Sequence, residues 1–151
     1  MTVRPTRLLA LAATIASLMA VAMAGAPSAS ASSSRSGALH IAKECTQDTG
    51  LADSFCTITS SNIDAIPTGT RVVYFQAIDA TGALNSDIAL PVGLGNVALG
   101  HVDLPATGPG PVTLSGGTGT FARFTARAVV TCDPTGIFCR WDGTYSFGHE
   151  D

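Results

Sequence analysis

Short stretches of alternating hydrophobic and polar residues fill the chain after residue 36, and each is followed by glycine, proline or small polar residues. The clearest stretch is residues 70–79, TRVVYFQAID, which is dense in the β-branched and aromatic residues that favour strands. No segment after residue 35 combines a helical period with capping residues. Breaks recur about every ten residues, a spacing typical of sandwiches and barrels, so the pattern predicts an all-β domain of roughly eight antiparallel strands.

The expected strands differ in length and are separated by recognisable turn sequences. They cover residues 37–45, 54–61, 70–79, 87–93, 96–105, 112–115, 121–132 and 140–147. Residues 62–69, 80–86 and 106–111 are expected to be turns because glycine, proline and asparagine cluster there. Pro91 predicts that its strand ends there or lies at a sheet edge, since proline cannot donate to a ladder.

Gly116, Gly117 and Gly119 lie between two of the expected strands, 112–115 and 121–132. A phosphate-binding P-loop needs GxxxxGK followed by Ser or Thr at a helix start, and a dinucleotide fingerprint needs GxGxxG entering a helix. This segment has no lysine, its glycine spacing is different, and the residues after it alternate as in a strand. We therefore expect these glycines to supply positive φ at a sharp bend in a β-barrel.

The N-terminus has the layout of a secretory signal peptide. Arg4 and Arg7 precede the apolar residues 8–24, and small residues at Ala29 and Ala31 mark a cleavage site. The alternative is a membrane anchor, but the apolar run is short, rich in alanine and not followed by a basic cluster. We expect residues 1–31 to be removed and the protein to be secreted, with no membrane insertion after cleavage.

The remaining chain is expected to form one domain with a short flexible start. Residues 32–36, SSSRS, are expected to be flexible, and residues 37–151 to form the domain. The chain carries 8 Lys and Arg against 11 Asp and Glu, and two of the arginines lie in the signal peptide. Without a basic cluster, nucleic acid and anionic membranes are not expected as partners.

All four cysteines lie in the domain, and an even number in an exported chain predicts two disulfides. Three pairings are open. We favour Cys45–Cys56 with Cys132–Cys139, because each pair brackets a polar loop that a hairpin would close. A zinc site is the alternative, but no CxxC spacing or nearby histidine supports it, so no metal is expected.

The glycine segment also carries a resemblance. Residues 114–131, LSGGTGTFARFTARAVVT, followed by residues 141–147, WDGTYSF, resemble the C-terminal half of the allene oxide cyclase barrel family and the related plant dirigent proteins. Residues 69–79 and 100–105 stand where those families place two middle strands. The resemblance implies an eight-stranded antiparallel, calycin-like barrel with a small apolar cavity. It also implies that a homo-trimer is an option for this chain.

The resemblance and the strand pattern name a few candidate catalytic residues. Plant members of the family use a glutamate of an early strand, and Glu44 is its nearest counterpart here, although the Ser-Pro that follows in those enzymes is missing. His101 and Asp103 lie two apart on one strand face and could form an acid–base pair, as could His40 with Glu44. Solvent-facing positions are the competing interpretation for all of them.

The last strand carries the candidate ligand-binding residues. Trp141, Tyr145 and Phe147 share one face, and together with Phe75 or Tyr74 they could line a pocket. We name Phe75, Trp141 and Tyr145 as the ligand-contacting set. The alternative is that these side chains only fill the barrel, as in other small barrels.

Three functions remain open on this sequence. The first is a secreted barrel that binds a small apolar molecule, and the second is a cofactor-free cyclase or isomerase that confines a reactive intermediate. The third is a structural or surface-interaction protein with a filled barrel. Motifs of serine hydrolases and zinc peptidases are absent from the sequence, and no cofactor is expected.

Overall fold

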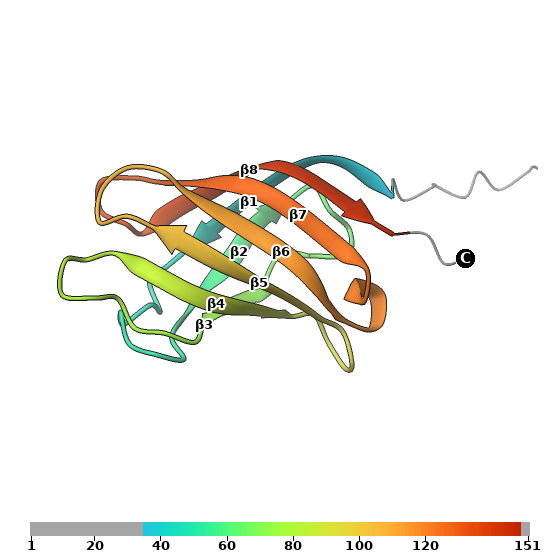
Figure 1. Cartoon of the computed structure of the whole chain (residues 1–151), viewed down its shortest axis with the longest axis horizontal. Helices are drawn as coiled ribbons and strands as arrows, with labels where there is room; N and C mark the ends of the chain where they lie inside the picture. The colour runs from blue at the N-terminus through green and yellow to red at the C-terminus, as the bar shows by residue number, and fades with distance from the viewer. Residues whose placement is uncertain (1–34, 149–151) are drawn as a thin grey trace, which may run out of the picture. The chain divides into compact units, whose positions relative to one another are not determined.

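The computed structural model describes residues 35–148, which form one closed barrel of eight antiparallel strands (Figure 1). The strands follow each other around the barrel in chain order, and β8 closes it by pairing with β1. Their bounds are β1 Ser36–Glu44, β2 Phe55–Ser61, β3 Arg71–Tyr74, β4 Leu84–Pro91, β5 Val97–Leu104, β6 Gly110–Thr118, β7 Phe124–Cys132 and β8 Phe138–Phe147. The only helical element among the described residues is the short turn η1, Gly119–Phe121. The predicted fold class is confirmed.

Side chains alternate between the barrel interior and solvent, as the period of a strand requires. In β4, Leu84, Ser86, Ile88 and Leu90 are buried, while the residues between them are exposed or half-buried. Trp141 of β8 is completely buried. The interior is therefore a packed apolar core along most of the barrel.

The two ends of the barrel are built differently. The open end, on the left in Figure 1, carries loops 45–54, 75–83, 105–109 and 133–137. The closed end carries loops 62–70 and 92–96, the turn η1 and both termini of the described chain. At the closed end, Ile63 and Ile66 of a loop and Phe121 of η1 are fully buried, so they plug the barrel.

Aromatic packing completes the plug at the closed end. The Phe124 ring lies 4.6 Å from that of Phe147 and 5.4 Å from that of Phe121, centroid to centroid. Tyr145 belongs to the same cluster, 5.8 Å from Phe147. Such ring pairs stabilise a core beyond the area they bury.

The glycine bend forms as expected. Gly116, Gly117 and Gly119 have φ values of +84°, +148° and +56°. β6 leaves β7 after the pair Ser115–Thr125 but stays bonded to β5, with a register shift between the two strands. A Cβ on Gly117 would lie 1.9 Å from the carbonyl oxygen of Val97, so only glycine fits there.

Both predicted disulfides are confirmed, and both lie at the open end. Cys45–Cys56 joins the residue after β1 to the second residue of β2, and Cys132–Cys139 joins the last residue of β7 to β8. Each bridge therefore closes a hairpin whose loop borders the open end of the barrel.

Several strand boundaries differ from the expectation: β6 covers residues 110–118 instead of 112–115, β7 begins at residue 124 instead of 121, and β8 begins at residue 138 instead of 140. β3 ends at Tyr74, not at residue 79, because the chain bends where Ser86 Oγ accepts from Gln76 N and Gln76 Oε1 accepts from Asp87 N. β4 begins at Leu84, inside the expected turn 80–86. Pro91 ends its strand, and in a closed barrel there is no free edge for it to occupy.

The N-terminal expectations lie mostly outside the described residues. The predicted signal peptide, residues 1–31, is among the residues that the structure does not describe. β1 begins at Ser36, and Phe147 N donates to the carbonyl oxygen of Arg35. Within residues 35–148, no helix has the length and apolar character needed to cross a membrane.

Candidate functional site

A pocket of about 620 Å³ occupies the open end of the barrel. Its walls come from the four loops of that end and from the inward face of the strands beneath them. Leu84, Val102, Leu104 and Val130 supply apolar wall, and Lys43 and Tyr74 lie among them. A site of this size and character can enclose a small, mainly apolar molecule.

Lys43 is the only lysine of the chain, and it points into the barrel. It follows Leu39 and Ile41 on the inward face of β1, and only 4% of its surface is exposed. Lysine is almost never buried to this degree unless a partner or a function holds it there. The contacts of its ammonium group therefore decide what the pocket can do.

The Lys43 side chain reaches a small polar cluster within apolar surroundings. Its Nζ donates a hydrogen bond to Tyr74 Oη and lies 3.9 Å from Cys56 Sγ. The same Nζ lies 5.0 Å from the centre of the Tyr74 ring and 5.3 Å from that of Trp141. Cation–π attraction to the two rings compensates part of the lost hydration.

Burial changes the protonation of both members of this pair. Desolvation lowers the pKa of Lys43 to about 8, although the carboxylate of Asp48 opposes the change. Burial raises the pKa of Tyr74, and Asp48 adds to that effect, so this hydroxyl stays protonated. The pocket thus holds an amine that releases its proton more readily than an exposed lysine does, beside a neutral hydroxyl.

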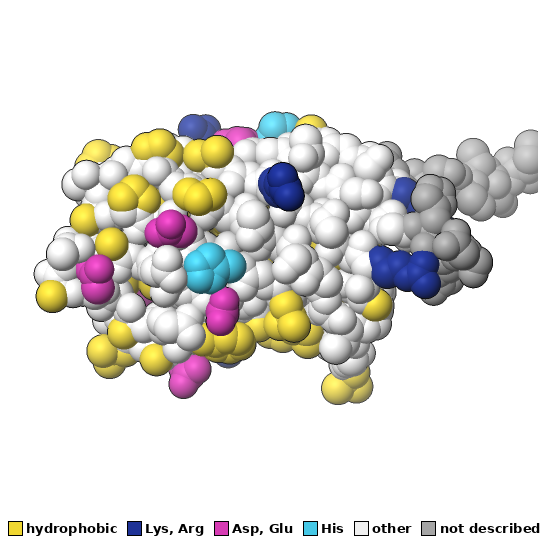
Figure 2. Space-filling view, in the orientation of Figure 1, with side chains coloured by type: hydrophobic (Ala, Val, Ile, Leu, Met, Phe, Trp, Pro, Cys, Tyr) yellow, Lys and Arg dark blue, Asp and Glu magenta, His cyan; other side chains and the backbone are white. Residues whose placement is uncertain are grey.

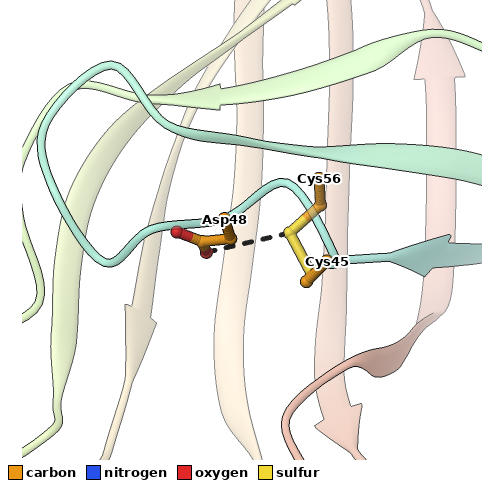
Figure 3. Close-up of side chains that lie close together, drawn as sticks. All are labelled: Cys45, Asp48 and Cys56. Atoms are coloured by element: carbon orange, nitrogen blue, oxygen red, sulfur yellow. Dashed lines mark hydrogen bonds between the residues drawn. A yellow bond between two sulfur atoms is a disulfide. The ribbon is translucent and has the colours of Figure 1, made fainter.

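Asp48 lies in the wall of the pocket, against the Cys45–Cys56 disulfide (Figure 3). Its Oδ1 accepts from Gly50 N at 2.8 Å and from Ser54 Oγ at 2.6 Å, and its Oδ2 lies 3.9 Å from Cys56 Sγ. The potential ligand atoms of these three residues lie within 4.8 Å of one another, but the two sulfurs are bonded to each other. The cluster therefore offers a carboxylate and no thiolate.

The candidate catalytic residues do not line this pocket. Glu44 lies on the opposite face of β1 from Lys43 and is half-buried. His101 and Asp103 do not pair with each other: His101 Nδ1 lies 2.9 Å from Oδ1 of Asp87, its cross-strand neighbour on β4. The structure thus corrects the pairing, because a directly opposite residue is closer than one two positions along the same strand.

His40 follows the same rule. Its Nδ1 lies 2.8 Å from Oδ1 of Asp142, which stands opposite it on β8, so Asp142 and not Glu44 is its partner. The side chains of both histidine–aspartate pairs are about half exposed on the outer wall. Neither pair can act on a molecule inside the barrel.

The candidate ligand-binding residues are dispersed. Phe75 is 43% exposed and is not part of the pocket wall. Tyr145 packs in the aromatic cluster of the closed end. Trp141 alone lies near the pocket, through its ring beneath the Lys43 Nζ, and its own Nε1 is buried without a hydrogen-bond partner in the described part of the chain.

Sequence reasoning missed Lys43 and Asp48 and reached Tyr74 only as an alternative to Phe75. The signal for Lys43 was present: Leu39, Ile41 and Lys43 alternate on one strand, so a lysine stands at an inward position. Tyr74 follows Val72 on the inward face of β3 in the same way, whereas Phe75 lies beyond the strand end. Asp48 could not be placed without the fold of loop 45–54.

Comparison of the chain with protein-family models, with curated proteins and with solved structures gives no match.

Proposed function

We propose that this protein binds a small, mainly apolar molecule in the pocket at the open end of its barrel. The observation that carries the proposal is the pocket itself, which has a volume of about 620 Å³. Ligand sites typically have volumes of about 300–1,000 Å³, with apolar walls and a few polar groups. Apolar burial contributes about 25 cal/mol per Å² before ordering costs, so micromolar binding needs no charged anchor.

Exposed hydrophobic side chains around the pocket support this assignment. Leu51, Phe75 and Ile78 belong to loops of the open end and are 66%, 43% and 40% exposed. Figure 2 shows hydrophobic and acidic side chains over this end of the barrel. Apolar side chains at the mouth give an apolar molecule a favourable route from solvent into the pocket.

We further propose that binding takes place outside the cell. Two disulfides are compatible with an extracellular protein, and residues 1–31 have the layout of a signal peptide. The closed eight-stranded barrel agrees with the fold of the allene oxide cyclase family, and we keep membership of that family as a proposal. Intact-mass analysis of culture supernatant checks export, and a cell-bound protein that retains residues 8–24 would contradict it.

A second candidate function is a cofactor-free isomerase or cyclase. Lys43 and Tyr74 favour it, because both ionisable groups lie in the pocket wall and have pKa values displaced by burial. An amine with a pKa of about 8 can accept a proton from a bound molecule near neutral pH. Turnover of a bound compound, abolished by Lys43→Met, would favour this function over binding alone.

The test of binding uses Trp141, the only tryptophan of the chain. Because its ring lies beneath Lys43, an apolar molecule in the pocket should change its fluorescence. We expect a saturable change with 1-nonanol at micromolar to submillimolar concentration. The proposal would be contradicted if a broad panel of apolar compounds gave no change in Trp141 fluorescence and no heat of binding by calorimetry.

A matched pair of variants separates pocket binding from binding elsewhere. Val102→Phe fills the pocket from β5, where Val102 is buried and lines the wall. Leu99→Phe places the same side chain on the same strand at a position that is 41% exposed. We expect Val102→Phe to weaken binding at least tenfold and Leu99→Phe to leave it unchanged.

A further inference from the structure

We propose that Lys43 forms a reversible imine with an apolar aldehyde or ketone that enters the open-end pocket. The inference rests on the proposed function, since it names the chemical class of molecule that the same pocket accepts. Its basis is the placement of the chain's only lysine in the wall of that pocket, with 4% of its surface exposed.

The burial of Lys43 favours nucleophilic chemistry over a structural role. A lysine that serves solubility lies on the surface, and a lysine that serves stability has a carboxylate within ion-pair distance. Neither holds here: Lys43 is buried, and the ion pairs found among the described residues do not include it. Desolvation leaves about a tenth of the amine neutral near pH 7, given its pKa of about 8.

The charges around the pocket favour a neutral ligand over a carboxylate. Asp48 and Asp133 both contribute to its wall, and no arginine does so in the described part of the chain. An anionic ligand would therefore meet two carboxylates and one ammonium group. An aldehyde or ketone avoids that repulsion, and its carbon chain can pack against the apolar wall formed by Val102, Leu104 and Val130.

Imine formation needs no oxidant or reductant. The neutral Nζ of Lys43 attacks the carbonyl carbon, a C–N bond forms, and the carbonyl oxygen takes up a proton as the nitrogen loses one. The C–O bond of this carbinolamine then breaks, the oxygen takes up the second proton of the nitrogen and leaves as water, and a C=N bond remains. Addition of water reverses both steps and releases the carbonyl compound.

Tyr74 is the residue that can pass the protons. Its Oη is hydrogen-bonded to Lys43 Nζ, and burial raises its pKa, so it stays protonated and can donate to the departing oxygen. Cys56 Sγ, 3.4 Å from the same Oη, holds the hydroxyl in place. Tyr74 is thus expected to affect the rate of imine formation more than the affinity for an apolar molecule.

The test traps the imine by reduction. The purified protein is incubated with nonanal and sodium cyanoborohydride, and the adduct is located by peptide mapping, in which the N-terminal amine is the internal reference. We expect modification at Lys43 to be at least tenfold faster in the folded protein than in the denatured chain. Equal rates in the two states, or modification of the N-terminus alone, would overturn the proposal; neither comparison requires a variant.

Control compounds and variants separate this inference from the proposed function. Lys43→Arg keeps the charge but cannot form an imine, so it should lose the adduct, and Tyr74→Phe should slow adduct formation severalfold. Saturable binding of 1-nonanol without a nonanal adduct at Lys43 would refute the imine and leave the binding function standing. Absence of both 1-nonanol binding and the adduct would refute both.

Discussion

The two ends of the barrel are stabilised in different ways. At the closed end, Phe121, Phe124 and Phe147 fill the interior and hold the strands through packing. At the open end a pocket replaces that packing, and two disulfides join neighbouring strands there instead. Crosslinks allow one end of a small barrel to remain hollow while the other end stabilises the fold.

Apolar packing and disulfides make comparable contributions to the free energy of folding. Burying one large apolar side chain stabilises a fold by about 1.5–3 kcal/mol, and one disulfide contributes about 2–4 kcal/mol. The open end can therefore lack several buried side chains without a net loss of stability. The same arrangement provides the apolar surroundings that desolvate Lys43.

Truncation of matched phenylalanines should show the largest difference between the ends. Phe124 is completely buried at the closed end, whereas Phe138 is 59% exposed at the start of β8, at the open end. We expect Phe124→Ala to lower the free energy of unfolding by about 3–5 kcal/mol and Phe138→Ala by at most about 0.5 kcal/mol. Urea denaturation under oxidising conditions measures the free energy of unfolding of both variants. Similar decreases would contradict the claim that packing stabilises the closed end more than the open end.

Glycines with positive φ offer a second contrast. A Cβ on Gly117 would clash with the Val97 carbonyl oxygen, whereas one on Gly136, in the β7–β8 loop of the open end, meets nothing within 4 Å. We expect Gly117→Ala to cost about 2–3 kcal/mol and Gly136→Ala about 1 kcal/mol, the cost of its φ of +73° alone. Equal melting temperatures for the two variants would remove the argument that Gly117 shapes the bend.

The buried lysine predicts a smaller effect that depends on pH. The unfolded chain keeps the proton of Lys43 up to its ordinary pKa of 10.5, whereas the folded protein releases it near 8. Between these values the unfolded state binds more protons, so the free energy of unfolding rises with pH. Tyr74, whose pKa burial raises, opposes this rise only as the pH approaches and passes its ordinary value of 10.0.

Denaturation at two pH values isolates the contribution of Lys43. Relative to Lys43→Met, we expect the free energy of unfolding of the parent protein to rise by about 2 kcal/mol between about pH 7 and about pH 9.5. Asp48 and Tyr74 are present in both proteins, so most of their effect cancels in the difference. A difference that does not change with pH would show that Lys43 is not desolvated.

The strands, the glycine bend and the disulfides were predictable from the sequence, whereas the pocket and its lining were not. Alternation and turn residues were sufficient for the eight strands, and the spacing of Gly116, Gly117 and Gly119 for the bend. The disulfides were predictable because each closes a local hairpin. All of these features depend on residues close together in the chain.

The pocket depends on contacts between distant segments. Lys43, Tyr74 and Trp141 come from β1, β3 and β8, and only barrel closure brings them together. His101 was assigned the wrong partner for the same reason, since Asp87 is its neighbour only in the register of β4 and β5. The predicted end of β3 was too late, because strand propensity takes no account of the hydrogen bonds that Gln76 makes where the chain bends.

Mapping ligand binding on the two ends by NMR tests most directly whether the open end holds the binding pocket. Amide chemical shifts of the ¹⁵N-labelled protein are followed during titration with 1-nonanol. We expect the largest changes at the open end, at Lys43, Ala106 and Gly136, and little change at Phe121 and Phe124. Changes centred on the aromatic cluster of the closed end, or binding that leaves the open-end amides unaffected, would contradict this assignment.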